Sequence, residues 1–410
     1  MRKTAFWIFL SFVSLTLWSQ RPLVQGSWKG VLTRTDGHEV PFLFSIENTK
    51  DHTVIQIHNG KERLSITDIT RTGDSLYFTL PFFEASFQTQ LQPDGHLTGA
   101  FIRSSSTGIL QFPFRAYPGQ RERFQVTATS TPKRVAGIWE ATFTRSNGTE
   151  RPSVASFEQQ GSQVTGTFLN PAGDYRYLEG IVNGDSLFLS AFDGSHIHLF
   201  TALIDAEGNL TNGWYYSGLS SKEPWKARRN PMAALPDSGN TPRLKEGFQT
   251  IQFSFPDLDS NWISSADPRF AGKVVIVQIM GSWCPNCMDE TAFLSQFYKK
   301  YQARGLEVVA LAYEYSTDFQ RSRKSLLKFK NQFQVTYPML ITGVKVGDSL
   351  RTEKTLPQLT SLSAFPTLLF IGKEGNVRKI ESGFSGPGTG QFHEAYKKSF
   401  TAFVEQLLAE

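Results

Sequence analysis

The sequence predicts two all-β units in tandem followed by an α/β domain, and three observations point to this fold class. Apolar and polar residues alternate in the first half between Asn-Gly and Asp-Gly turns, which is typical of antiparallel hairpins. Sequence anchors in this half recur in the same order, at the offset that separates Trp28 from Trp139 or, for the anchor at Gly95, two residues further on. Beyond residue 245, continuous β-branched runs alternate with helical patterns, which is typical of an α/β domain.

Residues 1–20 are interpreted as an export signal peptide. Arg2 and Lys3 precede an apolar run from Ala5 to Leu17, which is too short to span a bilayer comfortably, and Ser19 offers a small residue for cleavage. An uncleaved anchor is the alternative interpretation. We therefore expect the mature chain in the periplasm or otherwise secreted, with no stable membrane span after cleavage.

Residues 21–120 and 130–229 are predicted to be two copies of one β unit. Gly26-Ser27-Trp28 recurs as Gly137-Ile138-Trp139, and three further anchors follow in the same order in both copies. Such a series indicates an internal duplication. Each copy has room for about eight short strands, so we expect a small antiparallel barrel or a sandwich.

The aromatic residues of these units are expected to fill their cores rather than to line a ligand cavity. His196 and His198 lie two apart, which places both side chains on one face of a strand. A metal site would need a third ligand, and none is close in the sequence. We therefore interpret the two histidines as a surface pair.

Residues 230–245 are predicted to be a linker, because Pro231, Pro236 and Pro242 interrupt a polar stretch. Residues 246–410 are predicted to be the α/β domain. Its expected elements are strands at 274–279 and 306–312, a helix from the cysteine pair to about residue 301, a helix within 318–333, a hairpin of 367–371 and 377–382, and a helix at 391–408.

The net charge is +5, and charges of both signs are mixed along the chain. This distribution gives no basis for a nucleic-acid partner. The one basic stretch, residues 321–330, also contains Leu326, Leu327 and Phe329. We interpret it as a solvated helix face rather than as a surface for an anionic partner.

Cys284 and Cys287 are the only two cysteines in the 410 residues. They stand where a buried strand is expected to end and a helix to begin. A helix N-terminus stabilises a thiolate, so Cys284 is the expected nucleophile, and Cys287 lies one turn further on, where it can resolve a mixed disulfide. Half of a zinc site is the alternative, but the domain offers only His393 as a further ligand, and no metal is expected.

The order of strand, Trp283-Cys284-Pro285-Asn286-Cys287, helix and a later Phe365-Pro366-Thr367 resembles the thioredoxin fold. This resemblance covers about residues 246–408. Within it, residues 281–290 and 305–310 are similar to the signature and the next strand of the TlpA-like branch of secreted thiol–disulfide oxidoreductases. The resemblance implies that Pro366 has a cis peptide bond and faces the cysteine pair. It further implies that Trp283, Phe365 and Pro366 bind the substrate chain.

The resemblance also assigns a proton-transfer role. Thioredoxin has a buried aspartate six residues before its first cysteine, and Gln278 stands there in this chain. The TlpA-like branch has a glutamate three residues after the second cysteine, and Glu290 matches it. Glu290 is therefore the expected proton carrier for Cys287, and Glu307 is a weaker candidate.

These observations predict a secreted thiol–disulfide oxidoreductase that reduces disulfides of partner proteins and receives electrons from an upstream donor. No cofactor is expected beyond the Cys284–Cys287 dithiol. A thiol peroxidase of the peroxiredoxin type is one alternative, although Gly281 stands where that chemistry uses a threonine. A binding protein whose β half carries the main role is the other alternative.

Overall fold

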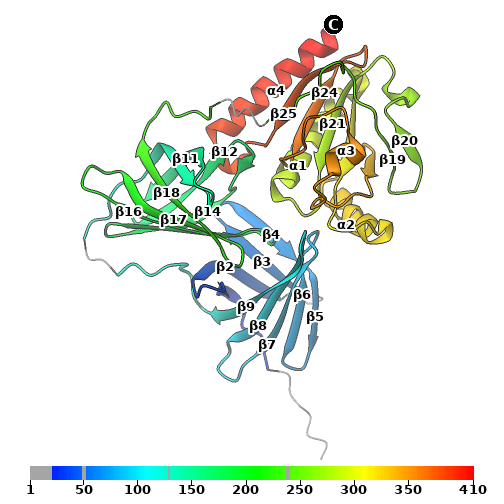
Figure 1. The fold of residues 1–410 in the computed structure, drawn as a ribbon. Coiled ribbons are helices and arrows are strands. Elements are labelled where there is room, and N and C mark those ends of the chain that lie inside the picture. The colour runs from blue at the N-terminus through cyan, green and yellow to red at the C-terminus, as the bar shows by residue number, and fades with distance from the viewer. Residues whose placement is uncertain (1–20, 49–51, 128–129, 237–240) are drawn as a thin grey trace, which may run out of the picture.

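The structure is a computed structural model that describes residues 21–48, 52–127, 130–236 and 241–410 (Figure 1). The predicted signal peptide lies outside the described residues. The predicted fold class is confirmed, because two antiparallel β units precede an α/β domain of the thioredoxin type. Within the described ranges, no helix has the length and apolar character needed to cross a membrane.

The first β unit is a nine-stranded meander in which sequence neighbours pair, and its first and last strands, β1 and β9, also pair with each other. The sheet order is β4-β3-β2-β1-β9-β8-β7-β6-β5. The strands are β1 (Gly26–Thr33), β2 (Glu39–Asn48), β3 (Thr53–Asn59), β4 (Glu62–Ile66), β5 (Asp68–Thr72), β6 (Ser75–Thr79), β7 (Ala85–Leu91), β8 (Leu97–Ser105) and β9 (Gly108–Pro118).

The second β unit has the same meander, and it closes into a barrel because β11 and β12 also pair. The pairing of β10 with β18 joins its first and last strands. The strands are β10 (Gly137–Thr144), β11 (Glu150–Gln160), β12 (Gln163–Asn170), β13 (Gly173–Asp174), β14 (Leu178–Asn183), β15 (Ser186–Phe192), β16 (Ile197–Ile204), β17 (Leu210–Ser217) and β18 (Ser221–Arg229). Because this sheet is closed, the second unit is a barrel, which was one of the two predicted forms, and not a sandwich.

The repeated sequence anchors occupy equivalent places in the two units. Trp28 in β1 and Trp139 in β10 are both fully buried. Each indole N–H donates to the carbonyl oxygen four residues earlier, at 2.9 Å to Val24 and at 2.8 Å to Val135. The same residue type therefore makes the same buried contact at the start of each copy.

The C-terminal domain is built on the sheet β23-β22-β21-β24-β25, in which β21, β22 and β23 are parallel and β24 and β25 are antiparallel to their neighbours. A small hairpin of β19 and β20 precedes it. The elements are β19 (Ser254–Pro256), β20 (Trp262–Ser264), η1 (Pro268–Phe270), β21 (Val274–Met280), α1 (Pro285–Tyr301), η2 (Gln302–Arg304), β22 (Leu306–Ala312), α2 (Phe319–Gln332), β23 (Met339–Ile341), α3 (Arg351–Thr355), β24 (Thr367–Ile371), β25 (Val377–Ser382), η3 (Pro387–Thr389) and α4 (Gln391–Ala409).

Strand β21 is buried on both faces, as its continuous apolar run predicts. Val274 and Ile276 pack in one cluster with residues of α1 and α4, such as Leu294 and Val404. The alternate residues of the strand pack in a second cluster on the other face. Burial on both faces holds the C-terminal end of β21 in place, and the cysteine pair follows four residues after this end.

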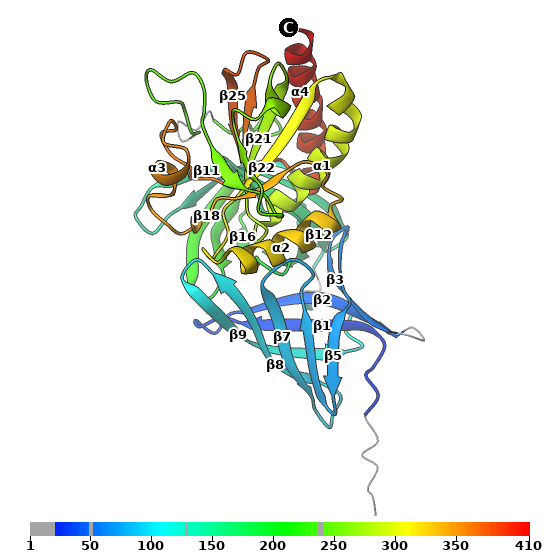
Figure 2. The same ribbon diagram turned by 90° about the vertical axis from the view of Figure 1, so that its right-hand side faces the viewer.

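The C-terminal domain lies against both β units (Figures 1 and 2). Helix α2 rests on the turn after β6, where the rings of Phe82 and Phe333 are 5.7 Å apart and Arg321 forms an ion pair with Glu84. The interpretation of residues 321–330 as a wholly solvated face is therefore corrected, because Phe329 of this stretch is also fully buried.

Aromatic packing fills the interior of the second β unit, and its removal tests this assignment. The ring of Phe168 is 4.9 Å from that of Phe200 and 5.1 Å from that of Trp225. Replacement of Phe168 by alanine is expected to lower the free energy of unfolding of this unit by about 3–5 kcal/mol, through lost burial and a cavity. Urea denaturation of the full chain measures the change.

The matched control is Phe248→Ala, because Phe248 is 49% exposed. That change is expected to shift stability by less than about 0.5 kcal/mol. Equal unfolding curves for the two variants would contradict an aromatic core at Phe168.

Candidate active site

The cysteine pair lies at the junction of β21 and α1, as the sequence predicts. Cys284 and Cys287 are joined in a disulfide, and their Cα atoms are 5.2 Å apart. Cys284 is the N-cap residue of α1, and the backbone N–H of Cys287 points to its sulfur at 3.3 Å. Pro285 occupies the first helical turn, where no backbone donor is required. The sulfur of Cys284 therefore faces the positive end of the helix dipole.

The three predicted substrate-binding residues surround Cys284. The Phe365–Pro366 peptide bond is cis, as the resemblance implies. The sulfur of Cys284 lies 3.6 Å from the carbonyl oxygen of Phe365. The rings of Trp283 and Phe365 meet edge to face at 5.5 Å, and the Trp283 indole donates to the carbonyl oxygen of Tyr313 at 2.7 Å. The structure thus brings together all the residues predicted to bind substrate.

Glu290 is a fully buried carboxyl group one helical turn beyond Cys287. The side-chain amide of Gln278 donates to its Oε2 at 2.8 Å, and its Oε1 has no hydrogen-bond partner within the part of the chain that is described. Burial raises the pKa of Glu290 well above its usual range, although the bond from Gln278 opposes this shift. Burial therefore favours the protonated form of Glu290.

Glu307, the weaker proton-carrier candidate, is held in another environment. Its carboxylate contacts the Lys273 ammonium at 2.6 Å and accepts from the Tyr298 hydroxyl at 3.0 Å. Lys273 immediately precedes β21, whereas the cysteines follow the opposite end of that strand. Glu307 is therefore a structural ion-pair residue.

Glu314 is a buried carboxyl group near the cysteine pair that the sequence analysis missed. It accepts hydrogen bonds from the backbone N–H of Ser282 at 2.8 Å and from the Ser282 hydroxyl at 2.6 Å. Burial raises the pKa of Glu314 to about 7. An acidic residue two positions after the apolar strand β22 is the one feature of the sequence that could have drawn attention to it.

The second β unit covers the cysteine pair, and no sequence pattern indicated this. A pocket of about 270 Å³, here called the junction pocket, opens onto Cys284. One wall is residues 283–286 with Phe365. The other wall comes from the second β unit and consists of loop 170–175 with His196, His198, Tyr215 and Ser217. Cys284 retains only 5% of its exposure.

The interpretation of His196 and His198 as a surface pair is wrong for His198, which is 4% exposed. Its Nδ1 and the Tyr215 hydroxyl are 3.0 Å apart in a hydrogen bond. Burial lowers the pKa of His198 well below its usual range, so its ring is neutral. Among the described residues, no group of three or more His, Cys, Asp or Glu side chains could hold a metal ion.

Arg176 fastens the second β unit over the cysteine pair. Its guanidinium contacts Asp289 of α1 at 2.8 Å, Glu62 of the first β unit at 2.7 Å and Asp193 of its own unit at 3.3 Å. The Arg176 side chain retains 4% of its exposure. One buried cation therefore joins carboxylates from all three parts of the chain.

The residues next to Arg176 extend this junction through hydrogen bonds. The Asp174 carboxyl accepts from the backbone N–H of Gly386 at 2.6 Å, and its carbonyl oxygen accepts from the Asn286 amide at 3.1 Å. Burial raises the pKa of Asp174 to about 7. The hydroxyl of Ser195 donates to the carbonyl oxygen of Trp283 at 3.0 Å. The cysteine motif is thus bonded to the second β unit on two sides.

Comparison with known proteins finds similarity in the C-terminal region. Residues 247–380 match the AhpC/TSA family. A thiol–disulfide oxidoreductase ResA of Bacillus thuringiensis is 27% identical over 159 residues, which are 39% of this chain and 80% of the relative. ResA of Bacillus subtilis is 25% identical over 140 residues, which are 34% of this chain and 69% of the relative.

Solved structures align with a similar fraction of the chain as these relatives do. A thiol:disulfide interchange protein of Chlorobium tepidum is 21% identical, with 40% of this chain and 97% of that chain covered and a TM-score of 0.28. A thiol–disulfide oxidoreductase of Bacteroides fragilis is 15% identical, with 36% and 99% covered and a TM-score of 0.28.

The C-terminal region is therefore an AhpC/TSA-type domain, and the relatives that it resembles are thiol–disulfide oxidoreductases. Together with the paired cysteines, this makes the domain a thioredoxin-like thiol–disulfide oxidoreductase. These matches place both β units outside the region of similarity.

Removal of the Arg176 charge tests whether the junction shields Cys284. In Arg176→Gln, the carboxylates of Glu62, Asp193 and Asp289 lose their shared buried cation, which is expected to weaken the covered arrangement by about 3–5 kcal/mol. After reduction, Cys284 of this variant should react several-fold faster with a bulky maleimide than Cys284 of the wild type. Stopped-flow labelling with mass-spectrometric assignment measures the rate.

Arg228→Gln is the matched control, because Arg228 belongs to the same unit but its ion pair with Glu140 is exposed. That variant should label at the wild-type rate. If Arg176→Gln also labels at the wild-type rate, Arg176 does not hold the cover in place.

Proposed function

We propose that this chain is an exported thiol–disulfide oxidoreductase that reduces disulfides of partner proteins through the Cys284–Cys287 dithiol. The observation that carries the proposal is the position of Cys284, at the N-terminus of α1 and 3.6 Å from the carbonyl oxygen of Phe365, whose peptide bond to Pro366 is cis. In this position a thiolate is stabilised and a substrate chain can be held against it. The proposed partners are disulfide-bearing proteins and an upstream dithiol donor.

The proposed reaction has two exchange steps. The Cys284 thiolate attacks one sulfur of the partner disulfide, which forms a mixed disulfide and releases the other sulfur as a thiolate. The Cys287 thiolate then attacks the sulfur of Cys284, which releases the second partner thiolate and leaves the Cys284–Cys287 disulfide. Two electrons pass to the partner, and the donor dithiol returns them to the pair.

Glu290 is the proposed proton carrier for the second step. It lies one turn from Cys287, and burial raises its pKa well above its usual range, which favours the protonated form. One of its oxygens has no partner among the described residues. The bond from Gln278 fixes the other oxygen. Such a group can exchange a proton with the Cys287 sulfur as that sulfur changes between thiol and thiolate.

A thiol peroxidase is the second class of enzyme to weigh, since residues 247–380 match the AhpC/TSA family. The peroxidase setting places a threonine three residues before the reactive cysteine, and this chain has Gly281 there. A β-carbon at Gly281 would lie 2.1 Å from the indole nitrogen of Trp283. A threonine therefore does not fit beside Trp283, which favours the disulfide reaction.

Export is proposed from the sequence of residues 1–20 and from cysteine usage. A basic start followed by a short apolar run is typical of a signal peptide. A chain whose only cysteines form one redox pair is also suited to an oxidising compartment, because it has no other thiol to mispair.

Substitution of each cysteine separates the two exchange steps. Cys284→Ser is expected to abolish reduction of insulin disulfides, because the attacking thiolate is lost. Cys287→Ser is expected to stop turnover after the first step and to accumulate a mixed disulfide on Cys284. A turbidity assay measures the first effect, and non-reducing electrophoresis with mass spectrometry measures the second.

The wild type provides the reference for both variants. If it neither reduces nor oxidises a protein disulfide, the proposed function is wrong. If Cys284→Ser keeps the wild-type rate, Cys284 is not the attacking residue.

Replacement of Glu290 by glutamine tests both the proton role and the raised pKa. Turnover near neutral pH should slow, because the amide cannot exchange the proton. Glu290 has a folded-state pKa well above its ordinary value of 4.5, so above that pH the unfolded chain binds fewer protons than the native one. Wild-type stability therefore falls as the pH rises above the ordinary value of 4.5, and Glu290→Gln should lose less stability over that rise.

Glu353→Gln is the control, since Glu353 is an exposed residue of α3. Urea denaturation at several pH values compares the variants, and the pH–rate profile reports the proton role. Parallel stability curves for wild type and Glu290→Gln would contradict the raised pKa. An unchanged pH–rate profile would assign proton transfer to another group.

A further inference from the structure

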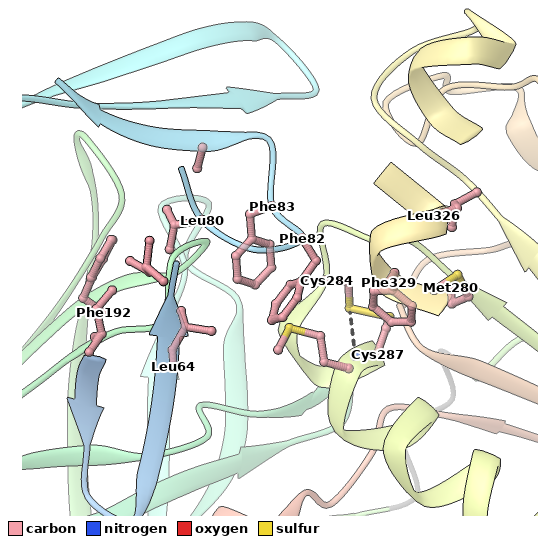
Figure 3. Packing of buried hydrophobic residues seen from close by; sticks show 14 of the residues in the cluster. Leu64, Leu80, Phe82, Phe83, Phe192, Met280, Cys284, Cys287, Leu326 and Phe329 are labelled. Carbon is pink, nitrogen blue, oxygen red and sulfur yellow. Dashed lines mark hydrogen bonds between the residues drawn. A yellow bond between two sulfur atoms is a disulfide. The ribbon is translucent and has the colours of Figure 1, made fainter. Parts of the chain in front are cut away.

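The approach to Cys284 is restricted by the second β unit. Residues 174 and 195 of that unit are bonded to the cysteine motif, and Cys284 keeps 5% of its exposure. On the other side, Phe82 and Phe83 of the first β unit belong to the same buried cluster as both cysteines (Figure 3). The junction pocket of about 270 Å³ opens onto Cys284 and is lined by the second β unit and the C-terminal domain.

Two residues that line this pocket, one on each wall, each have a buried polar atom without a hydrogen bond among the described residues. Nε2 of His198 and Oδ1 of Asn286 have no partner in the described ranges, although His198 is 4% and Asn286 is 6% exposed. Both residues line the junction pocket. Buried polar atoms are nearly always satisfied, so an unpaired pair in a pocket marks a place for complementary ligand groups.

The chemistry of these two atoms fits a peptide main chain. The amide nitrogen of Asn286 already donates to the carbonyl oxygen of Asp174, so Oδ1 remains as an acceptor for an N–H group. The neutral ring of His198 uses Nδ1 in its bond with Tyr215 and leaves Nε2 for a second bond. A peptide carries one donor and one acceptor per residue, whereas a charged ligand would find no buried counter-ion in these two groups.

The size and the lining of the junction pocket also fit a peptide segment. Its volume admits a short stretch of chain but not a folded surface, and the rings of Tyr175, Trp283 and Phe365 offer apolar walls. Aromatic walls with few fixed polar groups are typical of sites that hold a ligand in one orientation. The Arg176 ion pairs fix the wall of the second unit in place.

We propose that the second β unit forms one wall of the substrate site, and that the junction pocket takes an extended, cysteine-bearing peptide segment whose main chain bonds to His198 and Asn286. This inference rests on the proposed disulfide exchange. It narrows the substrates to disulfides carried on flexible segments, and it gives the second β unit a role in selecting them. His198 is then a specificity-determining residue.

Kinetics of the full chain with a synthetic peptide that carries one cystine bridge test this proposal. In His198→Leu, loss of one hydrogen bond is expected to raise KM for the peptide several-fold, up to about tenfold, with kcat and the redox potential unchanged. His198→Gln, which can place a polar atom near the position of Nε2, is expected to recover most of the loss. His96→Leu, a change at a partly exposed histidine of the first unit, should leave KM unchanged.

Photo-crosslinking provides a second test that leaves the pocket unaltered. The peptide, with a benzophenone residue beside its cysteine, is trapped on Cys284 of the Cys287→Ser variant and irradiated. We expect crosslinks within residues 170–217 of the second β unit. Crosslinks confined to residues 246–410, or the same KM in His198→Leu and in the wild type, would overturn the proposal.

The outcomes also separate this inference from the proposed function. If the wild type reduces neither the peptide nor insulin, and no mixed disulfide can be trapped, the disulfide reaction itself is wrong. If the wild type reduces the peptide but the His198 and crosslinking results are negative, only the role of the second β unit is wrong.

Discussion

The guanidinium of Arg176 is the interaction on which the arrangement of this molecule depends. It is buried and shared by Glu62 of the first β unit, Asp193 of the second and Asp289 of helix α1. Burial of one cation with several carboxylates is favourable only when all of them stay in place, since a separated partner would leave a charge without solvent or counter-ion. The three parts of the chain are therefore held in one geometry around the cysteine motif.

This geometry explains why two β units precede a redox domain in one chain. The C-terminal domain supplies the dithiol, the cis Pro366 and the buried Glu290. The first β unit packs against helix α2 of this domain, and its Phe82 belongs to the buried cluster that contains both cysteines (Figure 3). The second β unit covers Cys284 and completes the junction pocket. The C-terminal domain thus carries the reactive groups, and the two β units limit the access of other molecules to Cys284.

The sequence predicted features that depend on local patterns. Strand β21 was expected from its apolar run, the start of α1 from the cysteine motif, and the cis Pro366 from its resemblance to a family. The duplication was visible because the repeated anchors keep their order. The Arg176 network could not be predicted, because its members are far apart in sequence and follow no spacing rule. Burial of His198 was missed for the same reason, since the rings of Tyr175 and Tyr215 that pack beside it come from distant positions in the sequence.

In the oxidised, folded chain the second β unit lies over the cysteine pair. Hydrogen–deuterium exchange of segments 172–177 and 383–388 tests this arrangement most directly, because the N–H of Gly386 donates to Asp174 across the junction. We expect slow exchange in both segments, comparable to that of the strands beside them. Exchange of both segments at the rate of unprotected peptides would instead show that the junction is open and that the second β unit does not cover the cysteines.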